Sequence, residues 1–427
     1  MKNLLMCSYL FPPTGQVGIQ RLLAFAKYLP RYDWHPIILT VSNPSVPTES
    51  FQEDSEIARR LEVYKTPTLE PPYSVKRKIR SLLQKKEAGE SPSGIPLHAR
   101  VQWLDPYIGW VPSAALRGLW LIRKRNIRAI YVSAPPFSSF LLGMVLSRLT
   151  DVPWISDFRD EWCGFMAWGF SHGGRNKLAE RIERWVIETS SRIISVSEGI
   201  TTNFCRRYPL IDPNKFVTIN HGYDEDDFPD SLTKANGERT PKLRISFVGT
   251  ITRVTTARYF LSTLAKLAAN DADLSKKLEV HFYGRIVEEE RKLFDRDMLR
   301  GIVNIHGYLP HRDCPRVLCE SDVLLVMVDN VPGAERIITA KIFEYLAARR
   351  LILAIVPEGE TADLVRVSGA GIVVHPDNDE EQYKHLMNLT SSPQLERFRR
   401  MENRSVSQKY NRKHQTEQLA NMLDKIV

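Results

Sequence analysis

Two separate runs of alternating strand and helix patterns constrain the fold of this chain more than any other feature of its sequence. Short apolar segments typical of buried strands alternate with stretches, such as residues 21–29, whose apolar residues recur at helical spacing. The first run has strand-like segments at 3–10, 36–41, 127–133, 154–157 and 192–197, and the second has them at 243–249, 278–284, 303–307, 323–328, 351–356 and 371–374. Because this alternation builds parallel βαβ units, we expect an α/β fold of two doubly wound, Rossmann-like parallel sheets. Two such domains leave a cleft between them, where small-molecule sites often lie.

A polar stretch at 224–242 separates the two runs and has the composition of an interdomain linker. We therefore assign residues 1–223 to a first domain and 243–398 to a second. Residues 399–427 are expected to form a helical segment that packs back on the first domain. Residues 50–110, rich in proline and basic groups, are expected to form an insertion or a long loop region. The length of 427 residues agrees with two domains and extra segments, because domains average roughly 150 residues.

Several protein classes are excluded by composition. No apolar run reaches the roughly 20 residues that a membrane-spanning helix requires. The first residues also lack the cleavage pattern of a secretory signal. The five cysteines are scattered and are expected to be reduced thiols, which predicts a cytoplasmic protein.

The net charge of +9 favours an anionic partner. Basic residues concentrate at 76–86, which begins with Lys76-Arg77-Lys78 and ends with Lys85-Lys86, and in Arg123-Lys124-Arg125. Neither cluster has interleaved aromatic residues or a nucleic-acid-binding motif, so no nucleic-acid partner is expected. Two interpretations remain open: a solvated surface, or peripheral contact of 76–86 with an anionic inner membrane face.

Two glycines, Gly15 and Gly18, lie between the first strand and the first helix, where backbone N–H groups can approach a phosphate. The third glycine of a dinucleotide fingerprint is missing, and no acidic residue ends the second strand at 39–43, which disfavours NAD. The loop is predicted either to face a substrate or donor phosphate or to be a simple turn.

The predicted helix start at Thr339-Ala340-Lys341 is the strongest candidate for a binding site in the sequence. With Thr339 as N-cap, the first turn exposes unpaired N–H groups to an anion, and Lys341 adds a positive charge beside them. Glu344, one turn on, suits a diol whose hydroxyls both donate to one carboxylate. A phosphate next to a diol describes a nucleotide. The alternative is an ordinary amphipathic helix with a solvated Lys341–Glu344 pair.

Asp157, Arg159 and Asp160 follow a buried-looking strand, at the end where α/β sheets place their sites. Asp157 or Asp160 could orient an acceptor hydroxyl, and Arg159 could fix one of them or an acceptor phosphate. A structural Arg–Asp pair is equally compatible with the sequence. No aspartate-rich motif at a strand end demands a metal, and the acidic run 224–227 is interpreted as part of a solvated linker, so no metal site is predicted.

One group of motifs consists of the opening YLFPPTGQVGIQRLLAFAKYLP and the later SDFRDEW, ISVSEGI and NHGYDEDDF. A second group consists of FVGT, HGYLPH, SDVLLV and AKIFEYLAARRLILAIVPEG. In this order, over nearly the whole chain, the first group resembles the first domain and the second group the donor-binding domain of family-four retaining glycosyltransferases of the GT-B fold. The resemblance implies a nucleotide-sugar donor held by the second domain and an acceptor held by the first. It also implies transfer with retention, without a metal or a further cofactor.

The resemblance also implies roles for individual residues. Glu344 matches the second glutamate of the family's paired-glutamate motif, which binds the donor ribose. Thr339, Ala340 and Lys341 match its diphosphate-binding segment. The position of the first glutamate holds Arg336, so Glu335, one residue away, is the candidate for the sugar hydroxyls.

Two further pairs follow from the resemblance. Arg253 and Arg258 lie where the family places a basic pair on the phosphates, and Gly15 and Gly18 match the loop that faces donor and acceptor. Lys341 and Arg253 are thus expected to stabilise the leaving diphosphate, with Glu335 on the sugar.

Family-level resemblance favours saccharide or lipid-linked acceptors of envelope or exopolysaccharide synthesis. Two alternatives stay open. One is a GT-B-fold epimerase that acts on a nucleotide sugar alone, and the other is a non-catalytic nucleotide-sugar-binding protein.

Overall fold

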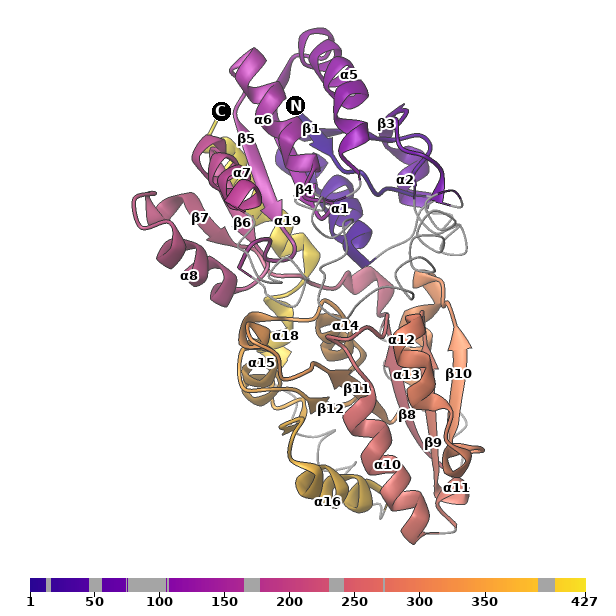
Figure 1. Ribbon diagram of the computed structural model, residues 1–427. Coiled ribbons are helices and arrows are strands. Elements are labelled where there is room, and N and C mark those ends of the chain that lie inside the picture. Colours follow the sequence, from indigo (N-terminus) through magenta and orange to yellow (C-terminus); the bar gives the residue numbers. More distant parts are fainter. Residues whose placement is uncertain are drawn as a thin grey trace, which may run out of the picture. The chain divides into compact units, whose positions relative to one another are not determined.

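The computed structural model describes residues 1–12, 17–45, 56–73, 75, 105, 107–164, 177–229, 242–271, 273–390 and 404–427. Gly15 and the basic residues 76–86 lie outside this set. The chain forms two compact units, one of Met1–Asn220 with Lys413–Val427 and one of His221–Arg412. Each unit consists of a parallel sheet with helices packed against it (Figure 1). Two parallel-sheet, Rossmann-like units confirm the predicted fold class.

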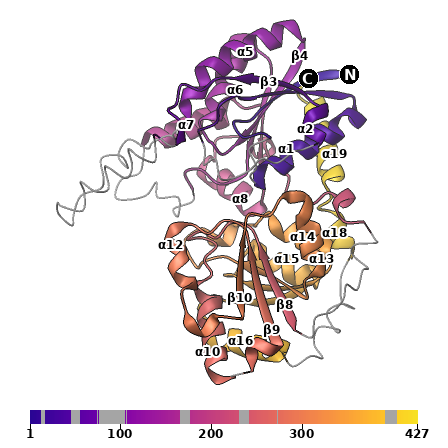
Figure 2. The same ribbon diagram turned by 90° about the vertical axis from the view of Figure 1, so that its right-hand side faces the viewer.

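The first unit contains a seven-stranded parallel sheet in the order β3-β2-β1-β4-β5-β6-β7. Its strands are β1 (Lys2–Cys7), β2 (Trp34–Val41), β3 (Glu62–Thr66), β4 (Ile127–Ala134), β5 (Trp154–Phe158), β6 (Arg192–Ser195) and β7 (Phe216–Thr218). Its helices are α1 (Val17–Tyr28), α2 (Glu56–Arg60), α5 (Val111–Lys124), α6 (Ser139–Thr150), α7 (Lys177–Thr189), α8 (Glu198–Arg207) and most of α19 (Arg412–Asp424). Within this unit, α5, α6 and α7 lie on one side of the sheet and α1 and α19 on the other (Figure 2).

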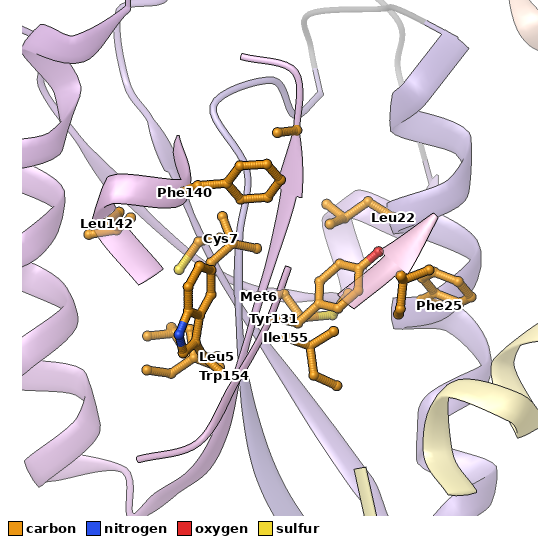
Figure 3. Close-up of a cluster of buried hydrophobic side chains, with 14 of the residues drawn as sticks. Leu5, Met6, Cys7, Leu22, Phe25, Tyr131, Phe140, Leu142, Trp154 and Ile155 are labelled. Atoms are coloured by element: carbon orange, nitrogen blue, oxygen red, sulfur yellow. The ribbon is translucent and has the colours of Figure 1, made fainter. Parts of the chain in front are cut away.

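Alternate residues of the central strands fill the core on both faces of the first sheet. Figure 3 shows Cys7 and Trp154 on the side of Phe140 from α6, and Tyr131 on the side of Phe25 from α1. Because parallel sheets are covered on both faces, their strands read as continuous apolar runs, which is why the sequence located most of them. All five strands predicted in the first run are present.

Two strands of the first unit escaped prediction. β3 lies inside the 50–110 region that we expected to be an insertion or loop, and it forms one edge of the sheet. β7 is only three residues long and forms the other edge. Edge strands bury little apolar surface, so Glu62–Thr66 (EVYKT) lacks the apolar run that marks the inner strands.

The second unit contains a six-stranded parallel sheet in the order β10-β9-β8-β11-β12-β13. Its strands are β8 (Leu243–Val248), β9 (Leu278–Tyr283), β10 (Val303–Gly307), β11 (Val323–Met327), β12 (Leu351–Ile355) and β13 (Gly371–Val374). Its helices are α10 (Arg258–Asn270), α11 (Leu274–Lys277), α12 (Glu288–Arg291), α13 (Cys314–Glu320), α14 (Lys341–Ala348), α15 (Glu360–Ser368), α16 (Asp379–Thr390) and α18 (Arg404–Gln408). Leu325 of β11 joins the core cluster under α10, whereas Leu324 and Val326 join the cluster under α14.

The described part of the linker segment and the C-terminal region are both ordered parts of these units. Asp224 is buried, and Tyr223 and Phe228 pack in the core cluster of the second unit, which therefore begins at His221. α19 supplies Leu419 and Leu423 to the core of the first unit. No helix in the described ranges combines the length and the apolar character needed to cross a bilayer.

Candidate functional site

The donor-binding residues predicted for the second domain lie in or beside loops at the carboxyl end of its sheet. The loop after β8, the loop after β11 and the first turn of α14 contact one another there. The N–H of Asp329 donates to the carbonyl of Val254 across 2.7 Å, and the hydroxyl of Tyr345 in α14 accepts from the N–H of Val248 across 3.0 Å. Thr339 and Lys341 lie at the start of α14, Glu335 lies in the turn before it, and Arg258 contacts Asp329 in the loop after β11.

Lys341 lies at this helix start without an acidic partner in the part of the chain that the structure describes. Its Nζ atom is 3.8 Å from the centroid of the Phe247 ring. A Cβ atom on Gly249 would come within 2.7 Å of the same Nζ, so a glycine at this position, with φ of +146°, leaves the space that the ammonium occupies. Burial lowers the pKa of Lys341 to about 7. Among the described residues no carboxylate forms an ion pair with Lys341, so an incoming anion would supply its counter-charge.

The helix begins one residue later than predicted. Ala340, not Thr339, is at the N-cap of α14, and no side chain caps the first turn. The Thr339 hydroxyl is buried and has no hydrogen-bond partner within the described residues, while the Thr339 carbonyl accepts from the N–H of Ile342. An uncapped helix start beside an unsatisfied buried hydroxyl is an environment in which a phosphate oxygen would find donors.

Glu344 points to a histidine that sequence reasoning missed. Its Oε1 is 3.1 Å from Nε2 of His311 and 4.0 Å from Nη2 of Arg412. Burial alone would raise the pKa of Glu344, but the hydrogen bond and charge of His311 lower it below its ordinary value. Burial likewise opposes the charged form of His311, yet the bond to Glu344 raises its pKa. The carboxylate is therefore held ionised, as hydrogen bonding to two ribose hydroxyls requires.

The predicted solvated Lys341–Glu344 pair does not form, because each side chain has other neighbours. His311 lies at the end of the HGYLPH segment and Arg412 follows α18 at the C-terminal end of the second unit. The Arg412 Nε donates to the carbonyl of Gly222 across 3.0 Å, which fixes the guanidinium near Glu344. The HGYLPH motif contained the signal for His311, whereas nothing in the sequence links Arg412 to this site.

Glu335 is half of a local ion pair. Its side chain, 54% exposed, binds the neighbouring Arg336 across 2.5 Å, within the short 3-10 turn Ala334–Arg336. Its backbone packs against Gly359, where an added Cβ atom would come within 2.3 Å of the Glu335 carbonyl oxygen. The backbone of Glu335 is thus tightly placed, while its carboxylate is accessible.

The two predicted arginines differ in their surroundings. Arg253, in the loop after β8, is exposed and has no ion-pair partner among the described residues. Arg258 begins α10 and its Nη2 lies 3.3 Å from the Asp329 carboxylate, which also accepts from the Tyr259 hydroxyl. Arg253 can therefore turn to an anion without breaking an ion pair among the described residues, whereas Arg258 would have to leave Asp329.

Asp157 corrects the prediction for the first unit. It is fully buried, and its carboxylate accepts two bonds from Arg21, at 2.9 and 3.1 Å, one from Tyr131 at 2.6 Å and one from Ser133 at 2.7 Å. Burial favours the neutral form, but Arg21 and these bonds lower the pKa of Asp157. With no exposed surface and four hydrogen bonds to side chains of its own unit, Asp157 cannot orient an acceptor. It is a structural Arg–Asp pair whose arginine is Arg21, not Arg159.

Arg159 lies against the start of α1, and Asp160 follows it in the chain. Arg159 donates to the carbonyls of Gly18 and Pro135, and a Cβ atom on Gly18 would lie 2.5 Å from the Arg159 guanidinium carbon. Gly18 therefore gives space to an arginine of the same unit. Asp160 is half-buried without a hydrogen-bond donor among the described residues, and burial raises its pKa to about 6. Of the three predicted acceptor-side residues, Asp160 alone has an uncommitted side chain.

Two family models match the chain in succession. Residues 20–227 match the model described as Glycosyltransferase Family 4, and residues 242–392 match the model described as Glycosyl transferases group 1. A curated relative, alpha-maltose-1-phosphate synthase of Mycolicibacterium smegmatis, is 23% identical over 222 residues. That alignment covers 50% of this chain and 56% of the relative, so the chain spans little more than half of the relative's length.

Solved structures resemble the whole chain. HepE of Anabaena, in complex with UDP-glucose, is 14% identical, covers 100% of both chains and has a TM-score of 0.67. Sucrose-phosphate synthase of Thermosynechococcus elongatus is 13% identical, with 100% of this chain and 99% of that chain covered and a TM-score of 0.69. At such identities the likeness concerns the fold.

Proposed function

The chain belongs to the family-4 type of GT-B glycosyltransferases, and on this premise we propose that it transfers a hexose from a nucleotide sugar to a saccharide or lipid-linked acceptor. We further propose that the transfer retains the anomeric configuration, needs no metal ion or other cofactor, and serves envelope or exopolysaccharide synthesis at the cytoplasmic face of a membrane. The observation that carries the proposal is the half-buried Lys341, which has no carboxylate partner within the described ranges and lies at the uncapped start of α14.

The donor is proposed to bind at the carboxyl end of the second sheet. UDP and UDP-glucose are bound by HepE, whose fold this chain shares, and this supports a uridine nucleotide as the first donor to test. The diphosphate would lie against the start of α14, with Thr339 Oγ1 and Lys341 Nζ as donors. Glu344, held by His311, would accept both ribose hydroxyls, and Glu335 would accept from hydroxyls of the sugar.

The groups near the leaving diphosphate are expected to contribute most to catalysis. As the anomeric bond breaks, negative charge grows on the diphosphate, and positive groups aimed there stabilise the transition state more than the ground state. Lys341 in a partly dehydrated position and the exposed Arg253 are the proposed groups. Arg258 would contribute only if its guanidinium left the Asp329 carboxylate to bind a phosphate. Asp160 is the proposed residue for orienting the acceptor hydroxyl.

The proposal is tested with Lys341→Ala and Glu344→Ala. The first removes the charge nearest the leaving group and should lower turnover by about 10²–10³. The second should mainly weaken donor binding, because it removes the ribose acceptor. Transfer is measured with a panel of nucleotide sugars and extracted glycolipid acceptors, with calorimetry for donor affinity. Lys276→Ala, an exposed lysine of the same unit, is the matched control.

Near-normal turnover in both site variants would contradict the donor-site assignment. NMR of the product anomer tests retention, and incubation with nucleotide sugar alone distinguishes transfer from epimerisation. Full activity after extensive chelator treatment is the expected outcome for a metal-independent enzyme.

A further inference from the structure

The outer surface of helices α5, α6 and α7 gathers exposed apolar side chains. Six of the 17 large hydrophobic side chains exposed in the described residues lie on these three helices. We call their six residues the outer α5–α7 surface: Leu116, Trp120, Val145, Leu149, Leu178 and Trp185. Leu116 is 74% exposed, Leu149 60% and Trp185 52%. Isolated exposed apolar residues are common, but this concentration on neighbouring helices calls for an occupant.

These side chains share one layer of the first unit. α5 packs against α6 and α6 against α7, and all three lie on the same side of the first sheet in Figure 2. The buried residues of α5, such as Gly118, face the sheet and α6, which leaves Leu116 and Trp120 on the opposite, outward side. α7 shows the same division, with Val186 buried and Trp185 outward. The apolar side chains therefore project from the outer faces of three adjacent helices.

The outer faces of α5 and α6 are also positively charged. α5 and α6 contain no aspartate or glutamate, whereas α5 carries Arg117, Arg123 and Lys124 and α6 carries Arg148. α7 is balanced in charge: its exposed Lys177, Arg181 and Arg184 accompany three glutamates, of which Glu183 is fully buried, Glu180 half-buried and Glu188 exposed. The positive charge of the outer α5–α7 surface therefore lies on α5 and α6. Exposed apolar side chains with basic side chains among them are complementary to a binding partner whose surface is anionic and whose interior is apolar.

One aromatic side chain of this surface is held in place. The Arg117 guanidinium lies 4.6 Å from the Trp120 ring centroid and 5.0 Å from that of Tyr64 on β3. The Tyr64 and Trp120 rings are 6.2 Å apart. Because Trp120 is already ordered by this stack while 45% exposed, inserting it into another phase costs little further side-chain entropy.

We propose that the outer α5–α7 surface binds an anionic lipid bilayer at its headgroup–acyl boundary. Tryptophan and leucine side chains would enter the boundary while the arginine and lysine head groups stay among the lipid phosphates. This proposal is independent of the proposed transfer reaction, since it concerns lipid binding in the absence of donor and acceptor. It also differs from membrane contact through residues 76–86, because every residue that carries it lies on described helices.

The test is flotation of the full-length protein with vesicles. Wild type should bind phosphatidylcholine vesicles that contain phosphatidylglycerol, bind pure phosphatidylcholine weakly, and dissociate at high salt because exposed charges are screened. The double variant Arg123→Glu with Lys124→Glu should lose about 30-fold or more in apparent vesicle affinity, since each basic residue near an anionic surface contributes about 1 kcal/mol. Leu116→Ser with Trp120→Ser should lose about tenfold or more through lost apolar burial.

Controls are placed on the second unit. Val367→Ser, at a side chain that is 66% exposed, matches the apolar change, and Lys276→Glu with Arg291→Glu matches the charge change. Both controls should bind vesicles as wild type does. Circular dichroism of each variant verifies folding, which exposed positions should not disturb. Failure of the wild type to bind anionic vesicles, or equal binding by the α5 variants and wild type, would overturn the proposal and leave a protein partner as the occupant to seek.

Discussion

At the scale of single residues, the ammonium of Lys341 is buried, and no carboxylate among the described residues offsets its desolvation. Its pKa of about 7 means that the ligand-free protein holds this side chain partly neutral near neutral pH. A group whose pKa is lowered by folding binds fewer protons in the folded state, so the ligand-free protein gains stability as pH rises above 7 toward the ordinary lysine pKa. A bound diphosphate reverses this relation, because it favours the charged form.

The first prediction concerns UDP affinity as a function of pH. Binding should take up a proton at Lys341 above pH 7, so affinity should fall there with a slope approaching about tenfold per pH unit. Calorimetry in buffers of different ionisation enthalpy measures this proton uptake directly. Lys341→Ala should bind weakly with a flatter profile. Equal pH profiles of UDP affinity in wild type and Lys341→Ala would show that Lys341 does not contact the phosphates.

At the scale of elements, a buried ion pair joins a strand to a helix. Asp157 of β5 and Arg21 of α1 bond through two oxygens, and Arg21 also donates to the carbonyl of Asn220 across 2.6 Å. This arginine thereby connects β5, α1 and the last residue of the first segment of the first unit.

Replacing Asp157 by asparagine should destabilise the first unit by about 3–5 kcal/mol, because it leaves the Arg21 guanidinium buried without its counter-charge. Urea unfolding measures the loss. Asp151→Asn is the matched control, since Asp151 is exposed at the end of α6 with φ of +56°, which asparagine tolerates. A change of similar size in both variants would contradict the structural role of Asp157.

Strands and helices were predicted from the sequence more accurately than the side-chain contacts between them. Inner strands such as Val323–Met327 were visible because burial on both faces requires a continuous apolar run. The edge strand Glu62–Thr66 was not, since its exposure leaves a mixed pattern. Partnerships across long separations left no local trace: Asp157 pairs with Arg21, 136 residues away, and Glu344 with His311, 33 residues away.

At the scale of the whole molecule, the first unit is completed by the end of the chain. Leu419 and Leu423 of α19 are fully buried in its core. Asp424 accepts from Trp34 Nε1 across 3.1 Å and from Lys2 across 2.9 Å. The second unit, His221–Arg412, is thus inserted between two segments of the first.

Truncation after Arg412 should therefore unfold or strongly destabilise the first unit, because it uncovers the core that α19 protects, while the second unit keeps its own transition. Differential scanning calorimetry with limited proteolysis distinguishes the two units. Lys2→Ala, which removes the exposed Lys2–Asp424 pair and the contact of the Lys2 ammonium with the Trp34 ring, should change stability by no more than about 1–2 kcal/mol. Loss of both transitions in the truncated protein would contradict independent folding of the second unit.

This insertion also fixes an order of events during synthesis. The ribosome delivers β1 to β7 first, yet the strand layer they form must wait for α19, which emerges only after every strand of the second unit. The later-made unit can close as soon as it leaves the exit tunnel, while the earlier-made one stays open on the side that α19 covers. Until translation ends, the nascent chain thus exposes the apolar residues of the first unit that α19 later covers. A chaperone would bind the nascent protein at these residues.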